Sequence, residues 1–95
     1  MNTTIENRYI WLNGKIMHLP DAQINVLSPT SQFGLNVFEG IRCYWNAKEE
    51  QLYAFRLVDH YKRLKCSQRL IKMEDTFSIE ELKSALLEVV IANDY

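Results

Sequence analysis

The residues best suited to chemistry lie in the run Phe33–Tyr44, which reads FGLNVFEGIRCY. Glu39 and Arg42 place opposite charges among residues that are otherwise typical of a buried strand. Gly34 and Gly40 supply backbone freedom where a side chain would obstruct. Charge and glycine both weaken an ordinary core strand, because a buried charge must be desolvated and glycine packs no side chain. The run is therefore more typical of a strand that lines a binding pocket.

The direction of the Arg42 side chain decides its role. If it points inward, its guanidinium needs an anion, either Glu39 or a ligand. If it points outward, it is a solvated strand charge, and the pattern leaves both interpretations open. A lone carboxylate such as Glu39 is by itself weak evidence for acid–base chemistry.

A second candidate, Arg63, stands in the letters HYKRL, one residue before the apolar position Leu64. A guanidinium there could hold a phosphate or a carboxylate through two parallel hydrogen bonds. The alternative is a surface helix arginine paired with Asp59, four residues earlier, and composition alone favours this alternative. His18 and His60 have no partner at catalytic or metal spacing, so both are expected to be structural or surface residues.

Composition narrows the class of protein. The chain has 95 residues, 47% of them hydrophobic and 24% charged, with a net charge of −1. These values predict one small globular domain with a thin core and give no electrostatic reason to expect nucleic acid or an anionic membrane. No window reaches the roughly 20 apolar residues of a membrane span, and the first residues lack the order of a signal peptide. We therefore expect a cytoplasmic protein in which Cys43 and Cys66 are reduced, with a disulfide between them the less favoured alternative.

The elements that must position these residues begin with a hairpin. Asn13-Gly14 lies between the apolar runs 9–12 and 15–19, and Asn-Gly favours a type I′ turn, which needs positive φ at both central residues. The Pro20–Ala22 segment then breaks the second strand. Ile24 and Val26 alternate with polar residues and suggest a short edge segment.

The middle of the chain is expected to hold two further strands. Ser28–Ser31 is expected to be a loop. A strand over Val37–Trp45 and another over Gln51–Leu57 are predicted, joined by the polar hairpin loop Asn46–Glu50.

Two helices follow. Asp59 can cap the first, which is expected to end near Leu70. The second begins with Ser78-Ile79-Glu80-Glu81, which has the spacing of a capping box, and Asn93 is a plausible stop. Strands followed by helices predict an α+β fold with an antiparallel sheet. The second helix has a wide apolar face with few strands to cover it, which suggests a fragment or a module that needs a partner; this face is formed by Ile79, Leu82, Leu86, Val89 and Val90.

Several blocks in the same order resemble the N-terminal domain of branched-chain amino acid aminotransferases, which are fold-type IV (class IV) pyridoxal-phosphate enzymes. The blocks are Trp11–Gly14, Phe33-Gly34, Val37–Tyr44, Phe55–Leu57 and His60–Leu64. The resemblance runs from about Tyr9 to the end of the chain. The letters FEGIR favour the branched-chain group over D-amino acid transaminases and aminodeoxychorismate lyases.

The resemblance implies roles for particular residues. The family arginine of this helix block grips the cofactor phosphate, and here it is Arg63. The aromatic residue before the first glycine and the phenylalanine of FEG line the apolar substrate pocket, which implies Phe33 and Phe38. The family often has tyrosine at the first position, so Phe33 lacks a hydroxyl found there. Gly40 and Arg42 are expected on the same pocket strand, and Arg42 is expected to help orient a substrate carboxylate.

The resemblance also implies what lies outside residues 1–95. The lysine that forms the Schiff base with pyridoxal 5′-phosphate belongs to a second, C-terminal domain in this family. We therefore expect residues 1–95 to be a truncated N-terminal domain without transaminase activity. The intact protein would move an amino group between leucine, isoleucine or valine and 2-oxoglutarate, as a homodimer or higher oligomer. The alternatives are a free-standing binding module and another class IV enzyme.

Overall fold

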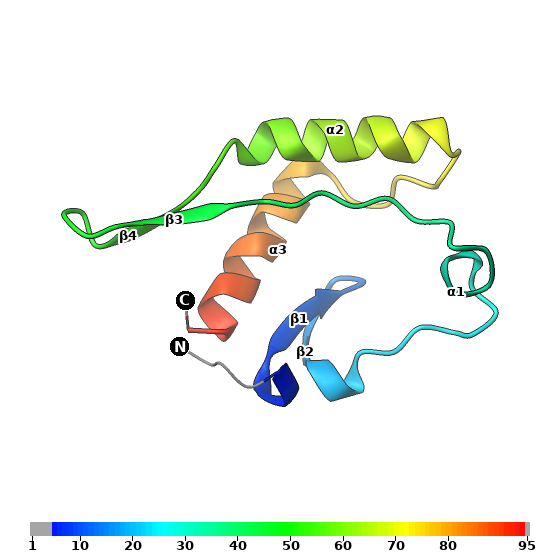
Figure 1. Ribbon diagram of the computed structural model, residues 1–95, viewed down its shortest axis with the longest axis horizontal. Coiled ribbons are helices and arrows are strands. Elements are labelled where there is room, and N and C mark those ends of the chain that lie inside the picture. Colours follow the sequence, from blue (N-terminus) through cyan, green and yellow to red (C-terminus); the bar gives the residue numbers. More distant parts are fainter. Residues whose placement is uncertain (1–4, 95) are drawn as a thin grey trace. The chain divides into compact units, whose positions relative to one another are not determined.

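The computed structural model describes residues 5–94, and the chain divides into two compact units. Unit 1 comprises Met1–Leu35 with Glu80–Tyr95, and unit 2 comprises Asn36–Ile79. Helices and two separate antiparallel two-stranded sheets confirm the α+β class (Figure 1). The prediction of one domain over the whole chain stays a prediction.

Unit 1 begins with the 3₁₀ turn η1 (Ile5–Asn7) and the hairpin of β1 (Tyr9–Leu12) and β2 (Lys15–His18). The two strands pair antiparallel from Tyr9 opposite His18 to Leu12 opposite Lys15. Asn13 has a φ of 50° and Gly14 a φ of 94°, so both central residues have the positive φ of the predicted turn. The hairpin prediction is confirmed, and the 3₁₀ turn η2 (Leu19–Asp21) ends the second strand.

The edge segment predicted around Ile24 and Val26 is wrong. Neither residue lies in a strand, and their side chains are 60% and 72% exposed. The Asn25 side chain accepts a hydrogen bond from the Leu27 amide at 2.7 Å, and the Asn25 carbonyl accepts one from the Ser28 amide. This local asparagine turn overrides the alternating pattern.

The loop predicted over Ser28–Ser31 is also wrong, because a short helix, α1 (Pro29–Phe33), forms there. The Ser28 hydroxyl caps it by accepting from the Ser31 amide at 3.3 Å. Pro29 suits the first helical position, where no amide donor is needed. Gly34 ends the helix in the left-handed conformation with a φ of 64°.

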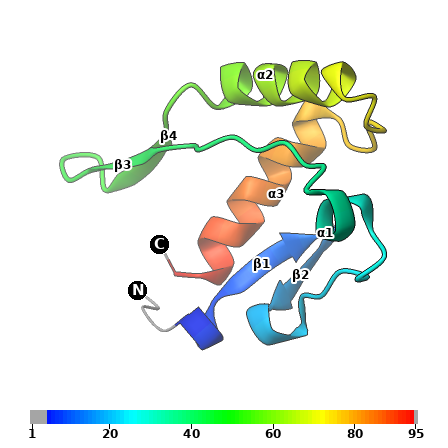
Figure 2. The ribbon, with the colours of Figure 1, turned by 45° about the vertical axis from the view of Figure 1, so that its right-hand side comes forward.

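The last helix, α3 (Ile79–Ala92), belongs to unit 1 from Glu80 onward; it begins directly after Ser78 and ends before Asn93, as predicted. Asn93 is 3% exposed. Its Oδ1 accepts from the Tyr9 amide at 2.9 Å, and its Nδ2 donates to the carbonyls of Tyr9 and Val89 at 2.8 and 2.9 Å. This Asn93 clasp ties the end of α3 to the start of β1. Figure 2 shows these two segments close together.

Unit 2 contains a hairpin of β3 (Cys43–Asn46) and β4 (Gln51–Ala54), which pair antiparallel from Cys43 opposite Ala54 to Asn46 opposite Gln51. The predicted strands were too long at both outer ends. Residues 37–42 are irregular, because no described strand pairs with them beyond one bond, from the Phe55 amide to the Arg42 carbonyl at 2.8 Å. This leaves the segment with Glu39 outside any sheet.

The helix of unit 2, α2 (Leu57–Leu70), begins two residues before the predicted cap. Arg56 stands at the cap position with a φ of 50°, which turns the chain directly from β4 into the helix. Asp59 is therefore in the first turn, where it accepts from Arg56 Nε at 2.9 Å. Lys65 of α2 holds the loop that follows the helix: its Nζ donates to Asp75 and to the Phe77 carbonyl, both at 2.6 Å.

The cores of both units are thin, as the length predicted. The buried apolar side chains among the described residues are Tyr61 in unit 2 and Ala85 in unit 1, each 7% exposed. Burial raises the pKa of the Tyr61 hydroxyl. Cys43 and Cys66 are free thiols, as expected. Within the described residues, none of the helices has the length and apolar character needed to cross a membrane.

Candidate functional site

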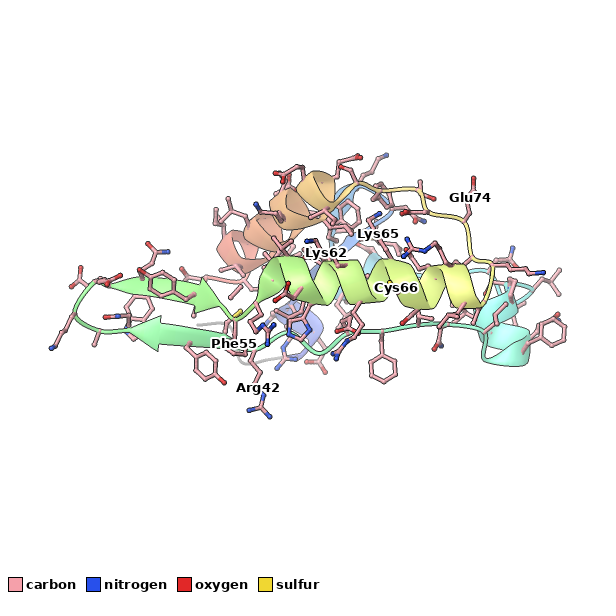
Figure 3. The ribbon with its side chains drawn as sticks, turned by 90° about the horizontal axis from the view of Figure 1, so that it is seen from above. Arg42, Phe55, Lys62, Lys65, Cys66 and Glu74 are labelled. Atoms are coloured by element: carbon pink, nitrogen blue, oxygen red, sulfur yellow. The ribbon has the colours of Figure 1, made fainter. Side chains whose placement is uncertain are left out.

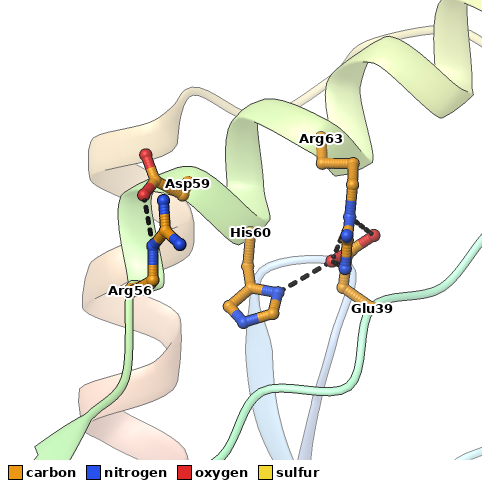
Figure 4. A network of polar contacts seen from close by, with 5 residues as sticks. All are labelled: Glu39, Arg56, Asp59, His60 and Arg63. Atoms are coloured by element: carbon orange, nitrogen blue, oxygen red, sulfur yellow. Dashed lines mark hydrogen bonds and ion pairs between the residues drawn. The ribbon is translucent and has the colours of Figure 1, made fainter.

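A cluster of three charged or ionisable side chains forms in unit 2 around the Glu39 carboxylate (Figure 4). Glu39 Oε1 lies 2.8 Å from His60 Nδ1 and accepts from Arg63 Nη2 at 2.7 Å. Arg63 Nε donates to both carboxylate oxygens, at 3.0 and 2.9 Å. These three residues are the Glu39 cluster.

The sequence explains how the cluster assembles. His60 and Arg63 are three residues apart on α2, so their side chains share one face of the helix. The irregular segment 37–42 is not held in a sheet and passes this face, where it presents Glu39. The Glu39 side chain is 8% exposed, whereas that of Arg63 is 68% exposed. The carboxylate is therefore enclosed and the guanidinium reaches solvent.

Electrostatics fix the protonation of the cluster. Hydrogen bonds from Arg63 and then His60 lower the pKa of Glu39 to about 2, so the carboxylate is ionised at neutral pH. The hydrogen bond to Glu39 and the negative charge of Glu39 raise the pKa of Arg63. An ionised carboxylate can only accept hydrogen bonds, so His60 carries its hydrogen on Nδ1.

Glu39 binds Arg63 from the side and leaves part of the guanidinium available. The contacts use Nε and Nη2. Among the described residues, no side chain or carbonyl accepts from Nη1. We call Nη1 and the second Nη2 hydrogen the free edge of Arg63. Such an edge matches two oxygens of a phosphate or a carboxylate.

Arg63 also lines an open depression of about 260 Å³. It is lined by Phe55, Arg56, Asp59, His60 and Arg63. Asp59 holds Arg56 through Nε, so the terminal nitrogens of that side chain are not used by this ion pair either. Two guanidinium groups beside one depression provide a donor set suited to an anion with several oxygens.

The structure excludes the alternative pairing considered for Arg63. Asp59 pairs with Arg56, and Arg63 binds Glu39, 24 residues away in sequence, so the pairing of Arg63 with Asp59 is wrong. Arg42 is exposed and points away from α2 (Figure 3). Of the two directions considered for its side chain, the structure therefore shows the outward one.

The predicted apolar pocket residues are open to solvent. Phe38 is 84% exposed, and a Cβ added at Gly40 would meet nothing within 4 Å. Both flank Glu39 on the irregular segment. Phe33 is 80% exposed and belongs to unit 1. Within unit 2, the predicted residues Phe38, Gly40 and Arg42 share the segment of Glu39, and Glu39 in turn contacts Arg63.

Sequence reasoning missed Glu39 and His60 as a pair. The available signal was the spacing of His60 and Arg63, which places two donors where one carboxylate can meet both. The long separation between Glu39 and α2 hid the carboxylate that they share. For a metal, the described residues offer no group of three or more suitable side chains.

The chain is similar to known aminotransferases in both sequence and structure. No protein-family model matches the chain. A probable branched-chain-amino-acid aminotransferase of Aquifex aeolicus is 38% identical over 82 residues, 86% of this chain and 26% of that protein. The branched-chain-amino-acid aminotransferase of Escherichia coli K12 is 36% identical over 92 residues, 97% of this chain and 29% of that protein.

Solved structures give the same result. The branched-chain aminotransferase of Thermoproteus uzoniensis, solved with norvaline, has a TM-score of 0.85 at 43% identity, covering 93% of this chain and 29% of that one. The branched-chain amino acid aminotransferase of Thermobaculum terrenum, solved in its PLP-form, has a TM-score of 0.83 at 38% identity, covering 97% and 30%. By sequence and fold the chain is similar to a segment of branched-chain aminotransferases, and it spans 26–30% of the length of these relatives.

Proposed function

We propose that this chain is the N-terminal part of a pyridoxal-phosphate-dependent branched-chain aminotransferase. The whole protein would transfer an amino group between leucine, isoleucine or valine and 2-oxoglutarate. The observation that carries the proposal is 43% identity at a TM-score of 0.85 to the Thermoproteus uzoniensis enzyme over 93% of the chain. The likeness covers nearly every element of both units.

The donor set of unit 2 fits the cofactor's phosphate. The free edge of Arg63 offers parallel donors to phosphate oxygens, and the depression that Arg63 lines is open to solvent. When bound, pyridoxal 5′-phosphate supplies an electron sink and carries the amino group. Arg63 would hold the phosphate and thereby fix the position of the cofactor.

The other predicted residues would form one wall of the substrate pocket. Phe33 and Phe38 offer exposed apolar surface, which suits a branched aliphatic side chain. Gly40 leaves room for close approach of a ligand. Arg42 is an exposed cation without a partner among the described residues, and it would orient a substrate carboxylate.

Residues 1–95 alone are expected to have no transaminase activity, because the family resemblance implies that the Schiff-base lysine lies in a second domain. The test assays the 95-residue chain and the product of the complete reading frame side by side, with leucine, 2-oxoglutarate and pyridoxal 5′-phosphate. Turnover by the longer protein alone supports the proposal. Turnover by the 95 residues would contradict it.

Two alternatives are decided by the same assay. A free-standing binding module would show no turnover even from the complete reading frame. Another class IV enzyme would act on D-amino acids or aminodeoxychorismate instead of leucine, isoleucine and valine. We further propose that the complete protein is cytoplasmic and forms a homodimer or a higher oligomer. Sedimentation of the complete protein would measure its oligomeric state.

A further inference from the structure

Glu39 has two opposite effects on the affinity of Arg63 for an anion. A carboxylate beside Arg63 neutralises its charge, which weakens attraction for any anion. The same carboxylate holds a long, exposed side chain in one orientation. Which effect prevails depends on which guanidinium nitrogens the carboxylate uses.

Glu39 uses only the side of the guanidinium. Its oxygens contact Nε and Nη2 and leave Nη1 available. A guanidinium has two edges that can each give an anion two parallel hydrogen bonds, Nε with Nη2 and Nη1 with Nη2, and Glu39 takes the first. The observed pairing therefore allows Glu39 and a phosphate to bind Arg63 at the same time.

His60 completes the arrangement. Its Nδ1 lies 2.8 Å from the oxygen that also receives Arg63 Nη2, so one carboxylate oxygen is held from two positions on α2. The Glu39 side chain is 8% exposed and that of His60 18% exposed, so solvent has little access to the contact between these two side chains. Arginine has many rotamers, and this freedom must be lost when it grips a ligand. An arginine already fixed by Glu39 loses less on binding.

We propose that Glu39, itself held by His60, is a positioning residue that fixes the guanidinium of Arg63 with its free edge toward the phosphate. The inference rests on the proposed function, because it assumes that Arg63 binds a phosphate. It assigns to the glutamate of FEG a role that differs from lining the apolar pocket.

The test is a titration of the ¹⁵N-labelled 95-residue chain with inorganic phosphate at constant ionic strength, followed at the side-chain resonances of Arg63. In the wild-type chain we expect the Nη signals to shift, while the Nε signal and the Glu39 carboxyl signal stay nearly unchanged. If phosphate displaces Glu39, the Nε and carboxyl signals move, which overturns positioning and leaves the phosphate role of Arg63 intact. If no Arg63 signal responds, both the positioning role and the phosphate role are overturned.

Variants decide the sign of the effect. Glu39→Gln removes one negative charge, so electrostatics alone predicts tighter phosphate binding. Positioning predicts weaker binding by about fivefold, because the amide retains only one good acceptor for Arg63. Glu39→Ala should bind more weakly still, and Glu39→Asp should recover part of the loss.

The matched control is Glu74→Gln, which makes the same charge change at an exposed position of unit 2 (Figure 3). We expect its phosphate affinity to equal or slightly exceed that of the wild type. Amide shifts of the β3–β4 hairpin report whether each variant is folded. Tighter binding by folded Glu39→Gln overturns the proposal. If that variant unfolds, the wild-type titration still decides between the outcomes.

Discussion

The Asn93 clasp of unit 1 and the Glu39 cluster of unit 2 both join residues far apart in sequence, yet they differ in what they leave unused. The Asn93 amide is 3% exposed, and its oxygen and its nitrogen are both engaged with Tyr9 and Val89. Arg63 is 68% exposed at its side chain and keeps a free edge. A saturated polar contact stabilises a fold, whereas an unsaturated one can bind a ligand.

The largest effect on stability is expected from removing the Asn93 side chain. Asn93→Ala leaves the amide and carbonyl of Tyr9 without their partner, which costs about 1–3 kcal/mol of unfolding free energy. Urea unfolding followed by amide NMR should show this loss in unit 1. Phosphate binding by the folded variant should be unchanged. The control is Asn36→Ala at an exposed position, which should alter neither property.

Replacing the guanidinium of Arg63 should weaken phosphate binding more than it lowers stability. Arg63→Lys keeps the charge but loses the planar donor pair, so phosphate affinity should fall about tenfold. The urea midpoint should move less than for Asn93→Ala, because the side chain is largely exposed. Phosphate titration by NMR measures the affinity. Unchanged affinity would mean that charge alone, without geometry, accounts for binding.

The stability of unit 2 should depend on pH through the ionisation of Glu39. The folded pKa of Glu39, about 2, lies below its ordinary value of 4.5. The contacts of the ionised carboxylate therefore stabilise unit 2 above pH 4.5, and this contribution is lost as the pH falls from 4.5 toward 2. A ¹³C carboxyl titration of Glu39 measures the midpoint directly. Glu39→Gln should lack this part of the acid destabilisation, and a midpoint near 4.5 would contradict the ion pair.

The smallest effect concerns two glycines that both have open space at the Cβ position. Gly34→Ala must adopt a φ of 64°, which costs about 1 kcal/mol and should appear as fraying of α1. Gly40 is not among the positive-φ glycines, so Gly40→Ala should change stability by less than about 0.5 kcal/mol. Thermal unfolding measures both. If the complete protein carrying Gly40→Ala is stable but binds substrate more weakly, the added methyl group obstructs a ligand that lies close to residue 40.

Local signals predicted the local elements well. Asn13-Gly14 predicted a hairpin because its turn chemistry is specific, and Ser78 with Asn93 marked the ends of α3. The errors arose where local patterns competed. Ser28 and Pro29 suit a helix start as well as a loop, and the run 37–42 resembles a strand although no described strand pairs along it.

The candidate site was predicted only in part, for a similar reason. Arg63 was identified through the resemblance of its block to a family, not through its own spacing. Its partner Glu39 lies 24 residues away, and a contact at that distance depends on how the chain folds back on α2. Asn93 is the same case, since a stop signal for a helix does not reveal that its side chain binds Tyr9, 84 residues away.

The central claim is that Glu39 holds one side of Arg63 while the free edge takes a phosphate. A crystal structure of the complete protein with pyridoxal 5′-phosphate tests it most directly. We expect Glu39 still to contact Nε and Nη2, and phosphate oxygens to accept from Nη1 and the second Nη2 hydrogen. A phosphate bound to Arg63 in place of Glu39, or held without Arg63, would contradict it.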